Sequence, residues 1–418
     1  MPSYNWIRNC LACDSTNLYM ILDMGRTPLP NAFTPQPVHD APEYPLELMH
    51  CRDCKHFQLG GAPAPEDMFT DYLYVNSAST LRQHHEDLIK DCEADGLLKR
   101  GYMDHQHVLD VGGNTGDLAD AFRTYGWNSY VIDPAFNLQG QRFKNGVPSY
   151  TGMFSSNLVR ELGLKAKFKL ITALNVVPHT PDPYDMLLGM KNALAPGGHI
   201  LIELVYFKST WETRDFGQIY FEHFSYFTVN SFRALADRVG LDVISSQFFP
   251  EIHGGTMRFT LQDKTSDDKI YEIHHDALLA EQISGIQDLD VLKHWRFAVE
   301  SNIVTLASKV KELHNAGRTI VAYGASAKSS TLFNHKLFKD SAQHIRYVTD
   351  DNPLKVGRYS PGVNIPIISS KALKKESEPV IICTVHNFRK EITEKIKGLT
   401  NKASLLHYVP SIEGEEIG

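Results

Sequence analysis

The sequence lacks an apolar run of the roughly 18 residues needed to cross a bilayer, so it predicts no transmembrane helix. Its first segment, MPSYNWIRNC, lacks the charged and apolar regions of a secretory signal, and we therefore expect a cytoplasmic protein. Positive charge is also scarce, because the 42 lysine and arginine residues are outnumbered by 49 acidic residues, which gives a net charge of −7. Phosphate contacts need a concentrated basic surface, so this balance disfavours a nucleic-acid-binding protein.

The length is too great for one compact core. At roughly 150 residues per domain, 418 residues predict two or three domains. Hydrophobic residues make up 42% of the chain and charged residues 22%, as in an ordinary folded domain. The composition therefore excludes a largely disordered chain.

Cysteine is rare, with six residues in the chain, but four of them form two close pairs. Cys10 pairs with Cys13 and Cys51 with Cys54, each across two intervening residues. Two such CxxC pairs supply four thiolates, the ligand set of a tetrahedral Zn²⁺ ion. A redox pair or unrelated thiols are the alternatives, which the matched spacing disfavours. Four ligands leave no open position on the metal, so we expect a structural zinc site.

The central part contains a strand, a glycine-rich loop and a helix in succession. Residues 107–111 are typical of a short apolar strand, residues 112–117 read Gly-Gly-Asn-Thr-Gly-Asp, and residues 118–122 favour a helix. This order lets backbone groups approach a nucleotide-like ligand, although the loop is not the G-x-G-x-x-G fingerprint. The candidate ligand contacts in the loop are Gly112, Gly113, Asn114 and Gly116.

Two further features accompany this loop. A predicted strand at residues 129–132 ends at Asp133, whose carboxylate can accept hydrogen bonds from two ribose hydroxyls. Residues 194–203 contain a Pro-Gly-Gly turn that leads into a buried strand. Together with the loop, these features resemble the class I methyltransferases, which bind S-adenosylmethionine (SAM) on a doubly wound sheet. An NAD-binding domain, or a domain that has lost its ligand, is the alternative.

In such sheets the ligand lies beyond the carboxyl ends of the strands. A predicted strand at residues 169–174 is followed by Asn175 and His179, so both are candidates for the crevice. A packed or helix-capping role is the alternative for His179. We expect Met153 to flank the adenine or to belong to the core.

A short aromatic stretch, residues 219–227, holds three titratable side chains within four positions. If the stretch is extended, Tyr220 and Glu222 share one face and His223 lies on the other. If it turns, all three can converge. Taken alone, the pattern favours an aromatic core strand with one buried histidine.

The C-terminal part repeats the order seen in the centre. After helices predicted for residues 268–315, a strand at 319–323 leads into a glycine turn and a helix from about Ser326. Further strands are predicted at 345–350 and 380–384. We therefore predict a second Rossmann-like unit, which would be an internal duplication of the first. A scaffold without a ligand is the alternative.

Short motifs extend over nearly the whole chain. After the CxxC pairs come Asp71-Tyr-Leu-Tyr-Val-Asn-Ser77, the glycine loop, Asn175-Val-Val-Pro-His179, Tyr220-Phe-Glu-His223, His253-Gly-Gly-Thr-Met-Arg258, Tyr323-Gly-Ala-Ser-Ala-Lys328 and Asp351-Asn-Pro-Leu-Lys-Val-Gly-Arg358. This order resembles the sugar C-methyltransferases, which act on nucleotide-linked 4-keto-deoxysugars. The resemblance implies an α/β protein with an N-terminal zinc-binding module (1–72), a class I SAM methyltransferase domain (73–265) and a Rossmann-like C-terminal domain (266–418) that helps to bind the nucleotide-sugar.

The resemblance also implies roles for single residues. His223 and Tyr220 would flank the reacting carbon, with His223 as the preferred base and Tyr220 as the runner-up or the donor to the enolate. The sugar would be surrounded by Glu222, His179 and Tyr74, with Tyr72 as the alternative to Tyr74. The substrate-binding residues would be His253, Arg258, Lys328, Lys355 and Arg358. The last three carry charges that suit phosphates, but solvent exposure explains a lone basic residue equally well.

The expected chemistry follows from these residue types. A carbon beside a ketone loses a proton only if the enolate oxygen is stabilised, and a histidine near neutral pH suits the removal. The nucleotide part of the substrate is expected to be dTDP, as is usual in the family. The sequence does not determine the sugar, the methylated position or the oligomeric state. The alternatives are an O- or N-methyltransferase, and a non-catalytic zinc and Rossmann-like binding protein, which the intact loop and Asp133 disfavour.

Overall fold

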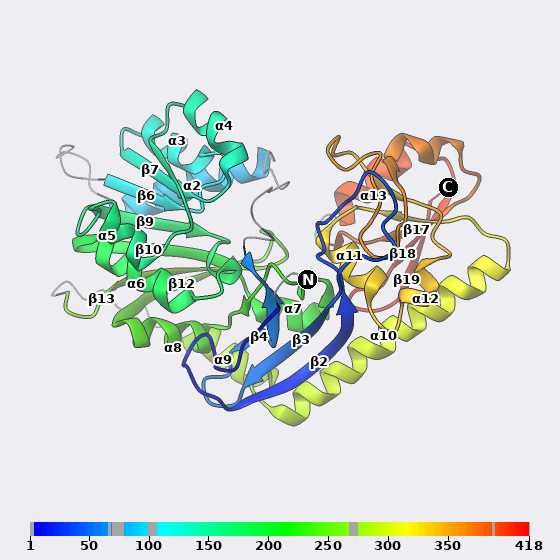
Figure 1. Cartoon of the computed structure of the whole chain (residues 1–418), viewed down its shortest axis with the longest axis horizontal. Helices are drawn as coiled ribbons and strands as arrows, with labels where there is room; N and C mark the ends of the chain where they lie inside the picture. Colours follow the sequence, from blue (N-terminus) through cyan, green and yellow to red (C-terminus); the bar gives the residue numbers. More distant parts are fainter. Residues whose placement is uncertain are drawn as a thin grey trace.

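The computed structural model describes residues 4–65, 68, 79–98, 107–266, 275–386 and 389–417, with the backbone alone for 79–81 and 275. The N-terminal strands are β1 (Tyr4–Trp6), β2 (Leu18–Thr27), β3 (Tyr44–Cys51), β4 (Phe57–Leu59) and β5 (Gly61–Pro63). β1 pairs with β5, and β2, β3 and β4 form an antiparallel sheet. β11 (Ser225–Tyr226), from the middle of the chain, completes this sheet beside β4. In Figure 1 these strands lie between two larger α/β parts.

The central part is a seven-stranded sheet in the order β12-β13-β10-β9-β6-β7-β8. Its strands are β6 (His107–Val111), β7 (Asn128–Asp133), β8 (Ser149–Thr151), β9 (Phe168–Leu174), β10 (Leu194–Val205), β12 (Leu241–Phe249) and β13 (Thr256–Asp263). β6 to β10 run parallel, whereas β13 is antiparallel to both of its neighbours. The winding reverses between β6 and β9, so a crevice opens beyond the carboxyl ends of these two strands.

The helices of this part have recognisable ends. They are α2 (Ser79–Ala94), α3 (Asp117–Thr124), α4 (Gln139–Lys144), α5 (Ser156–Glu161), α6 (Pro183–Ala193), α7 (Phe207–Thr213) and α8 (Val229–Val239), with short 3₁₀ turns η2 (Phe136–Leu138), η3 (Val177–His179) and η4 (Phe216–Gln218). Thr228 caps the start of α8 by accepting from the Ser231 amide, and Gly240 ends it in the left-handed region. α6 starts with Pro183 after the cap Asp182.

The C-terminal part is a six-stranded sheet in the order β16-β15-β14-β17-β18-β19. Its elements are α9 (His275–Ser284), α10 (Leu289–Asn315), β14 (Ile320–Tyr323), α11 (Ala327–Asn334), α12 (Lys339–Ala342), β15 (Val348–Asp350), β16 (Ile367–Ser369), η5 (Ser370–Lys375), β17 (Val380–Cys383), α13 (Arg389–Lys397), β18 (Ala403–His407) and β19 (Glu413–Ile417). All but β19 run parallel, and the winding reverses between β14 and β17. The predicted α/β fold with a second Rossmann-like unit is confirmed.

One hydrophobic core is shared by all three parts of the chain. It contains buried side chains from β2, β3 and β4, from residues 207–226, and from α10 and the C-terminal sheet. Trp211 and Trp295 stack in it with ring centroids 5.3 Å apart, and the Trp295 indole donates to the Trp211 carbonyl at 2.9 Å. The N-terminal strands and α10 therefore hold the segment before His223 from both sides.

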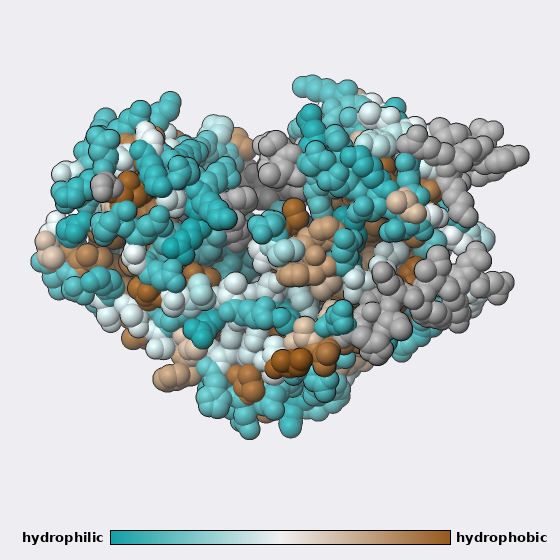
Figure 2. Space-filling view, turned by 180° about the vertical axis from the view of Figure 1, so that it is seen from behind, coloured by the Kyte–Doolittle hydropathy of each residue, from teal (hydrophilic) through white to brown (hydrophobic). Residues whose placement is uncertain are grey.

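The face seen from behind is mainly hydrophilic, and its hydrophobic residues lie in small separate groups (Figure 2). Among the described residues, no helix combines the length and apolar character that a membrane span requires.

Candidate active site

A cavity of about 640 Å³ lies where the three parts of the chain meet. Its walls come from the carboxyl ends of β6, β7, β9 and β10, from the segment around His223, and from the start of α11 with the ends of β15 and β17. Asn31 and Met68 add a side from the N-terminal segment. The cavity is thus large enough for a bound ligand of ordinary size and is formed by segments far apart in the sequence.

The glycine loop forms one end of this cavity. Gly112 has φ of +69°, and a Cβ there would lie 2.5 Å from Val176 Cγ2, so a larger residue does not fit. Gly116, with φ of +85°, precedes the first residue of α3. Gly113 and Asn114 line the cavity between them. The loop therefore presents close backbone to the cavity, as the sequence predicted.

Asp133 closes the same end and organises the loop. Its Oδ2 accepts from the Asn114 amide at 2.9 Å, and its Oδ1 accepts from the Ala135 amide at 2.8 Å and from the Arg142 guanidinium at 3.2 Å. Burial raises the pKa of Asp133, and these donors oppose the rise. The carboxylate keeps lone pairs beyond these three contacts and borders the cavity, so it can also accept from a ligand.

Asn175 marks the switch point between β6 and β9. It follows β9 with φ of +56°, a strained conformation that is tolerated best by asparagine among residues with a Cβ. Its side-chain Oδ1 is buried and has no hydrogen-bond partner among the described residues. An orphaned amide oxygen that borders a cavity is suited to accept a hydrogen bond from a ligand.

Residues 220–223, hereafter the YFEH turn, bend instead of extending, because the His223 amide donates to the Tyr220 carbonyl at 2.9 Å. Tyr220, Glu222 and His223 consequently all line the cavity. The Tyr220 hydroxyl lies 2.8 Å from His223 Nε2, and the two ring centroids are 4.1 Å apart. His223 Nδ1 lies 2.9 Å from the Gln218 carbonyl oxygen. A carbonyl can only accept, so Nδ1 carries the proton and Nε2 is left to accept from Tyr220.

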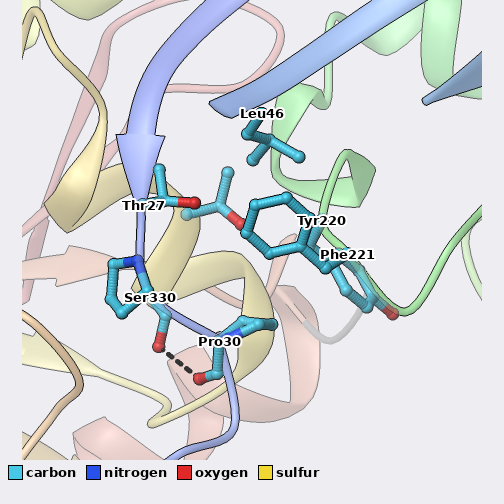
Figure 3. Close-up of a pocket in the computed structure, with 8 residues that line it drawn as sticks. Thr27, Pro30, Leu46, Tyr220, Phe221 and Ser330 are labelled. Carbon is cyan, nitrogen blue, oxygen red and sulfur yellow. Dashed lines mark hydrogen bonds between the residues drawn. The ribbon is translucent and has the colours of Figure 1, made fainter. Parts of the chain in front are cut away.

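The back of the YFEH turn packs into a narrow crevice between the N-terminal strand β2 and helix α11 (Figure 3). Tyr220 and Phe221 line this crevice together with Thr27 and Leu46. The Ser330 hydroxyl, from α11, donates to the Pro30 carbonyl at 2.7 Å and closes one side. This packing fixes the direction in which the turn presents its polar side chains.

Burial dominates the electrostatics around the YFEH turn. Desolvation, together with the neighbouring His179 ring, holds the pKa of His223 well below its ordinary value. The rings of His179 and His223 meet edge to face, with centroids 4.7 Å apart. Burial lowers the pKa of His179 to about 4. Both imidazoles are therefore neutral near pH 7.

Glu222 shows the opposite effect. Burial raises its pKa to about 7, although Asn31 and the charge of Lys355 act to lower it. The Asn31 amide donates to Glu222 Oε1 at 2.7 Å. Asn31 comes from the N-terminal segment and Lys355 from the loop after β15, so a residue of each outer part faces this carboxyl. Near neutral pH a large share of the Glu222 carboxyls carries a proton and can donate a hydrogen bond.

The far wall reproduces the geometry of the first glycine loop. The Ala325 amide donates to Asp350 Oδ2 at 2.8 Å, and the Asn352 amide donates to Asp350 Oδ1 at 2.8 Å. The amides of Asn114 and Ala135 make the same two bonds to Asp133. Each sheet thus places a carboxylate, held by a glycine-turn amide and by the amide two residues on, at the cavity.

The basic residues expected to bind substrate take different positions. Lys328 lines the cavity, but its ammonium is bound to Asp215 Oδ2 at 2.6 Å. Lys355 lines it too, with its ammonium on the Ala325 carbonyl at 2.7 Å and over the Phe33 ring. Arg358 does not border the cavity and donates to the Phe33 carbonyl at 3.1 Å.

The remaining residues that the sequence predicted at the site also differ in whether they border the cavity. His253 lines the cavity, whereas Arg258 lies behind it, bound to Glu203 at 2.7 Å and to Asp91 at 2.8 Å. Met153 is 44% exposed and does not border the cavity. Tyr74 and its alternative Tyr72 lie outside the described residues.

Several cavity residues were not among the site candidates drawn from the sequence. They are Asn31, His84, His85, Asp110 and Glu203. Asp110 accepts from the Thr172 hydroxyl at 2.8 Å, and burial raises its pKa to about 7. Glu203 lies between His84, at 2.8 Å, and Arg258. A carboxylate within an apolar strand pattern was the only local sign, and it was present for Asp110 and Glu203.

The four cysteines of the two CxxC pairs converge at one point. Their sulfur atoms all lie within 4.8 Å of one another, with Cys10 and Cys54 3.5 Å apart and Cys13 and Cys51 3.6 Å apart. A tetrahedral zinc ion with Zn–S bonds of about 2.3 Å places sulfurs roughly 3.8 Å apart, so the residues fit the metal. Each knuckle turns in the same way, because the amides of Asp14 and Lys55 bond back to the carbonyls of Cys10 and Cys51.

Three protein-family models match successive parts of the chain. They are described as "Putative zinc binding domain" (residues 10–69), "Methyltransferase domain" (residues 81–246) and "C-methyltransferase C-terminal domain" (residues 251–410). The C-methyltransferase NovU of Streptomyces niveus is 27% identical over 395 residues, which cover 94% of this chain and 92% of NovU.

Two further similarities are confined to part of the chain. A tRNA U34 carboxymethyltransferase of Nautilia profundicola is 33% identical over 106 residues, 24% of this chain and 35% of that protein. A crystal structure of a SAM-dependent methyltransferase from Clostridium acetobutylicum covers 44% of this chain and 92% of its own, at 14% identity and a TM-score of 0.35.

Proposed function

We propose that this chain, which is similar to the C-methyltransferase NovU and matches a C-methyltransferase C-terminal domain, methylates a carbon beside the ketone of a nucleotide-linked 4-keto-deoxysugar. The observation that carries this proposal is the convergence of Tyr220, Glu222 and His223 on a cavity that has a glycine turn and a carboxylate at each end. The sugar would lie between these ends, beside the YFEH turn.

One end of the cavity suits SAM, which supplies a methyl group as an electrophile when it is bound. The close backbone at Gly112, the carboxylate of Asp133 and the orphaned oxygen of Asn175 can hold a nucleoside and an amino-acid portion there. Gly113, Asn114 and Gly116 form the rest of the loop. Met153, which was expected to flank the adenine or to belong to the core, does not border the cavity and has no part in this proposal.

The other end suits the nucleotide of the substrate. The family resemblance implies that this nucleotide is dTDP. Support comes from Asp350, which repeats the hydrogen-bond geometry of Asp133. Lys355 adds a cation at the rim, and burial lowers its pKa. His253 borders the cavity near the methyltransferase sheet and would contact the sugar-facing side.

The His223–Tyr220 pair supplies the base. Nε2 of His223 is unprotonated, because Nδ1 holds the proton for the Gln218 carbonyl. The carbon–hydrogen bond beside the ketone breaks, the proton passes to the Tyr220 oxygen as the Tyr220 hydroxyl proton passes to His223 Nε2, and the electron pair moves onto the ketone oxygen. The Tyr220 hydroxyl, hydrogen-bonded to the same nitrogen, lies where it can relay this proton.

The developing enolate oxygen needs a hydrogen-bond donor. With a pKa raised to about 7, Glu222 can donate a proton in a hydrogen bond, and Asn31 holds its other oxygen in place. His179 packs edge to face on His223 and keeps water away from the dyad. The enolate carbon would then form the new carbon–carbon bond to the methyl group while the methyl–sulfur bond breaks and leaves its electron pair on sulfur, and the carbon–oxygen double bond would be restored.

Exchange of the proton beside the ketone with solvent deuterium tests this proposal. A dTDP-4-keto-deoxysugar is incubated in D₂O with the protein and S-adenosylhomocysteine, and the proton signal at the carbon next to the ketone is followed by NMR. We expect exchange with the unaltered protein, and a loss of roughly 10²–10⁴-fold with His223→Gln while SAM binding persists.

Two results would contradict the proposal. One is methyl transfer to such a sugar without exchange at carbon, which indicates methylation at oxygen or nitrogen. The other is full exchange with His223→Gln, which removes the dyad as the base. Mass spectrometry of the products with SAM present identifies the methylated sugar.

A further inference from the structure

A buried ion pair joins the C-terminal sheet to the segment that precedes His223. Lys328, in the first turn of α11, binds Asp215 Oδ2 at 2.6 Å, and the two side chains are 13% and 8% exposed. Although burial opposes ionisation, the neighbouring Lys328 and His386 hold the pKa of Asp215 below its ordinary value. The Asp215 carboxyl is therefore charged at neutral pH.

The pair fixes a turn whose backbone leads directly to the base. The Gln218 amide donates to the Asp215 carbonyl at 3.1 Å, so Asp215 holds η4 through its backbone as well as its side chain. Gly217 lies against the stem of Lys328, and a Cβ at Gly217 would be 3.1 Å from Lys328 Cβ. A side chain at position 217 would therefore crowd Lys328.

The same turn sets the tautomer of His223. The Gln218 carbonyl accepts from His223 Nδ1–H at 2.9 Å, which leaves Nε2 unprotonated toward Tyr220. If the turn shifts, this acceptor is lost and the proton can move to Nε2. A histidine protonated at Nε2 cannot accept a proton from carbon at that atom.

We propose that Lys328 and Asp215 are positioning residues, which hold the 215–218 turn so that His223 keeps its unprotonated Nε2 toward Tyr220, beside the substrate. The proposal rests on the proposed role of His223 as base. It gives Lys328 a task other than the phosphate contact that its sequence suggests, because its ammonium is already bound within the protein. The C-terminal sheet would then contribute to the chemistry through this turn.

The tautomer can be measured on the protein alone. With ¹⁵N-labelled histidine, the two imidazole nitrogens of His223 are followed by NMR and assigned by comparison with His223→Gln. We expect Nδ1–H in the unaltered protein and a measurable share of Nε2–H in both Lys328→Met and Asp215→Asn. Lys336→Met is the matched control, since Lys336 also joins the C-terminal part to the N-terminal segment, through Asp23 at 2.8 Å.

Steady-state kinetics distinguish a positioning role of Lys328 from a direct contact between Lys328 and the substrate. We expect Lys328→Met and Asp215→Asn each to lower kcat by roughly 10²-fold with little change in KM, and the double variant to be no worse than either. A direct phosphate contact predicts instead a higher KM for Lys328→Met and an unchanged enzyme for Asp215→Asn, which would overturn the proposal.

The test does not depend on the identity of the substrate. An unchanged His223 tautomer in both variants refutes the positioning role even if no sugar is ever methylated, whereas a changed tautomer with no turnover on keto-sugars refutes the proposed substrate alone. If Lys328→Met does not fold, the His223 tautomer in Asp215→Asn decides the test. Lys328→Arg keeps the charge, and we expect His223 to retain Nδ1–H in that variant.

Discussion

Glu222 shows how burial can give one carboxyl a second role. Its pKa of about 7 comes from desolvation, and Asn31 and Lys355 face it from the two outer parts of the chain. Below pH 7 it is mainly a hydrogen-bond donor, and above pH 7 it is mainly an anion that repels a developing enolate. If Glu222 faces the enolate as proposed, activity would depend on pH within the physiological range.

We predict that kcat/KM falls as pH rises through about 7, because Glu222 loses its proton. No fall is expected on the acidic side until well below pH 6.5, since the pKa of His223 is lowered. A pH–rate profile measures both limbs. Glu222→Gln keeps a hydrogen-bond donor but does not titrate, so the fall in kcat/KM above about pH 7 should disappear in this variant. An unchanged fall would assign the titration to another group.

The same carboxyl should affect stability. A raised folded-state pKa means that the native protein binds this proton more tightly than the unfolded chain, so stability is lost as pH rises from about 4.5 to about 7. Relative to the unaltered protein, Glu222→Gln should gain roughly 2–3 kcal/mol between pH 5 and pH 8. Denaturant titrations at the two pH values measure this, and Asp110 contributes equally to both proteins. Parallel stability curves would exclude the shift.

At the scale of elements, the pairing of β4 with β11 joins the zinc site to the YFEH turn. β4 begins three residues after Cys54, and β11 begins two residues after His223. The Leu59 amide donates to the Phe224 carbonyl at 3.0 Å, and His56 lies 3.2 Å from the Ser225 hydroxyl. The CxxC knuckles, through β4, thus hold the strand on which the turn rests.

We therefore predict that loss of the metal weakens turnover while SAM still binds. Purified protein should contain about one zinc per chain, and Cys51→Ser should lower both the zinc content and kcat. SAM affinity, measured by calorimetry, should change little because the glycine loop lies in the other sheet. A protein that is free of zinc and fully active would contradict this coupling.

The glycine loop and β7 form a second functional unit. Asp133→Asn keeps the side-chain shape but removes the charge that organises the loop and would accept from a ribose. A charge-assisted hydrogen bond contributes about 1.5–3 kcal/mol, so SAM affinity should fall by roughly 10- to 100-fold. Isothermal calorimetry measures it, with Asp350→Asn as the control, which should leave SAM affinity unchanged. Equal affinities of Asp133→Asn and the unaltered protein would exclude the role.

Local patterns predicted those parts of the site that lie close together in the sequence. The CxxC spacing predicted the four-thiolate cluster, and the strand–loop–helix order predicted the Gly112 turn and the position of Asp133. Asn31 and Glu222 are 191 positions apart, and Lys328 and Asp215 are 113 apart, so no local pattern contained either contact. Whether residues 219–227 extended or turned was equally open, since tertiary packing on β2 and α11 decides it.

At the scale of the whole molecule, the shared core makes the three parts interdependent. Trp295 on α10 is 5% exposed, stacks on Trp211 and contributes to the core that includes β2 and the C-terminal sheet. Since α7 ends just before η4, a cavity at this point would disturb the segment that precedes the YFEH turn.

Trp295→Ala should lower the free energy of unfolding by about 3–5 kcal/mol, because it removes a large buried ring and the bond to the Trp211 carbonyl. Calorimetry should show a lower Tm for the chain as a whole. Phe297→Ala, on the same helix but 72% exposed, is the control and should change Tm little. A Tm that is equal for both variants would argue against a shared core.

The repeated carboxylate turns also have a consequence for inhibitor design. Asp133 and Asp350 border one continuous cavity, and each is flanked by a backbone amide at a glycine turn. A single compound with a nucleoside at each end and a short neutral spacer could engage both sites at once. Its selectivity would derive from the spacer length, because proteins with a solitary Rossmann-type site offer no second anchor.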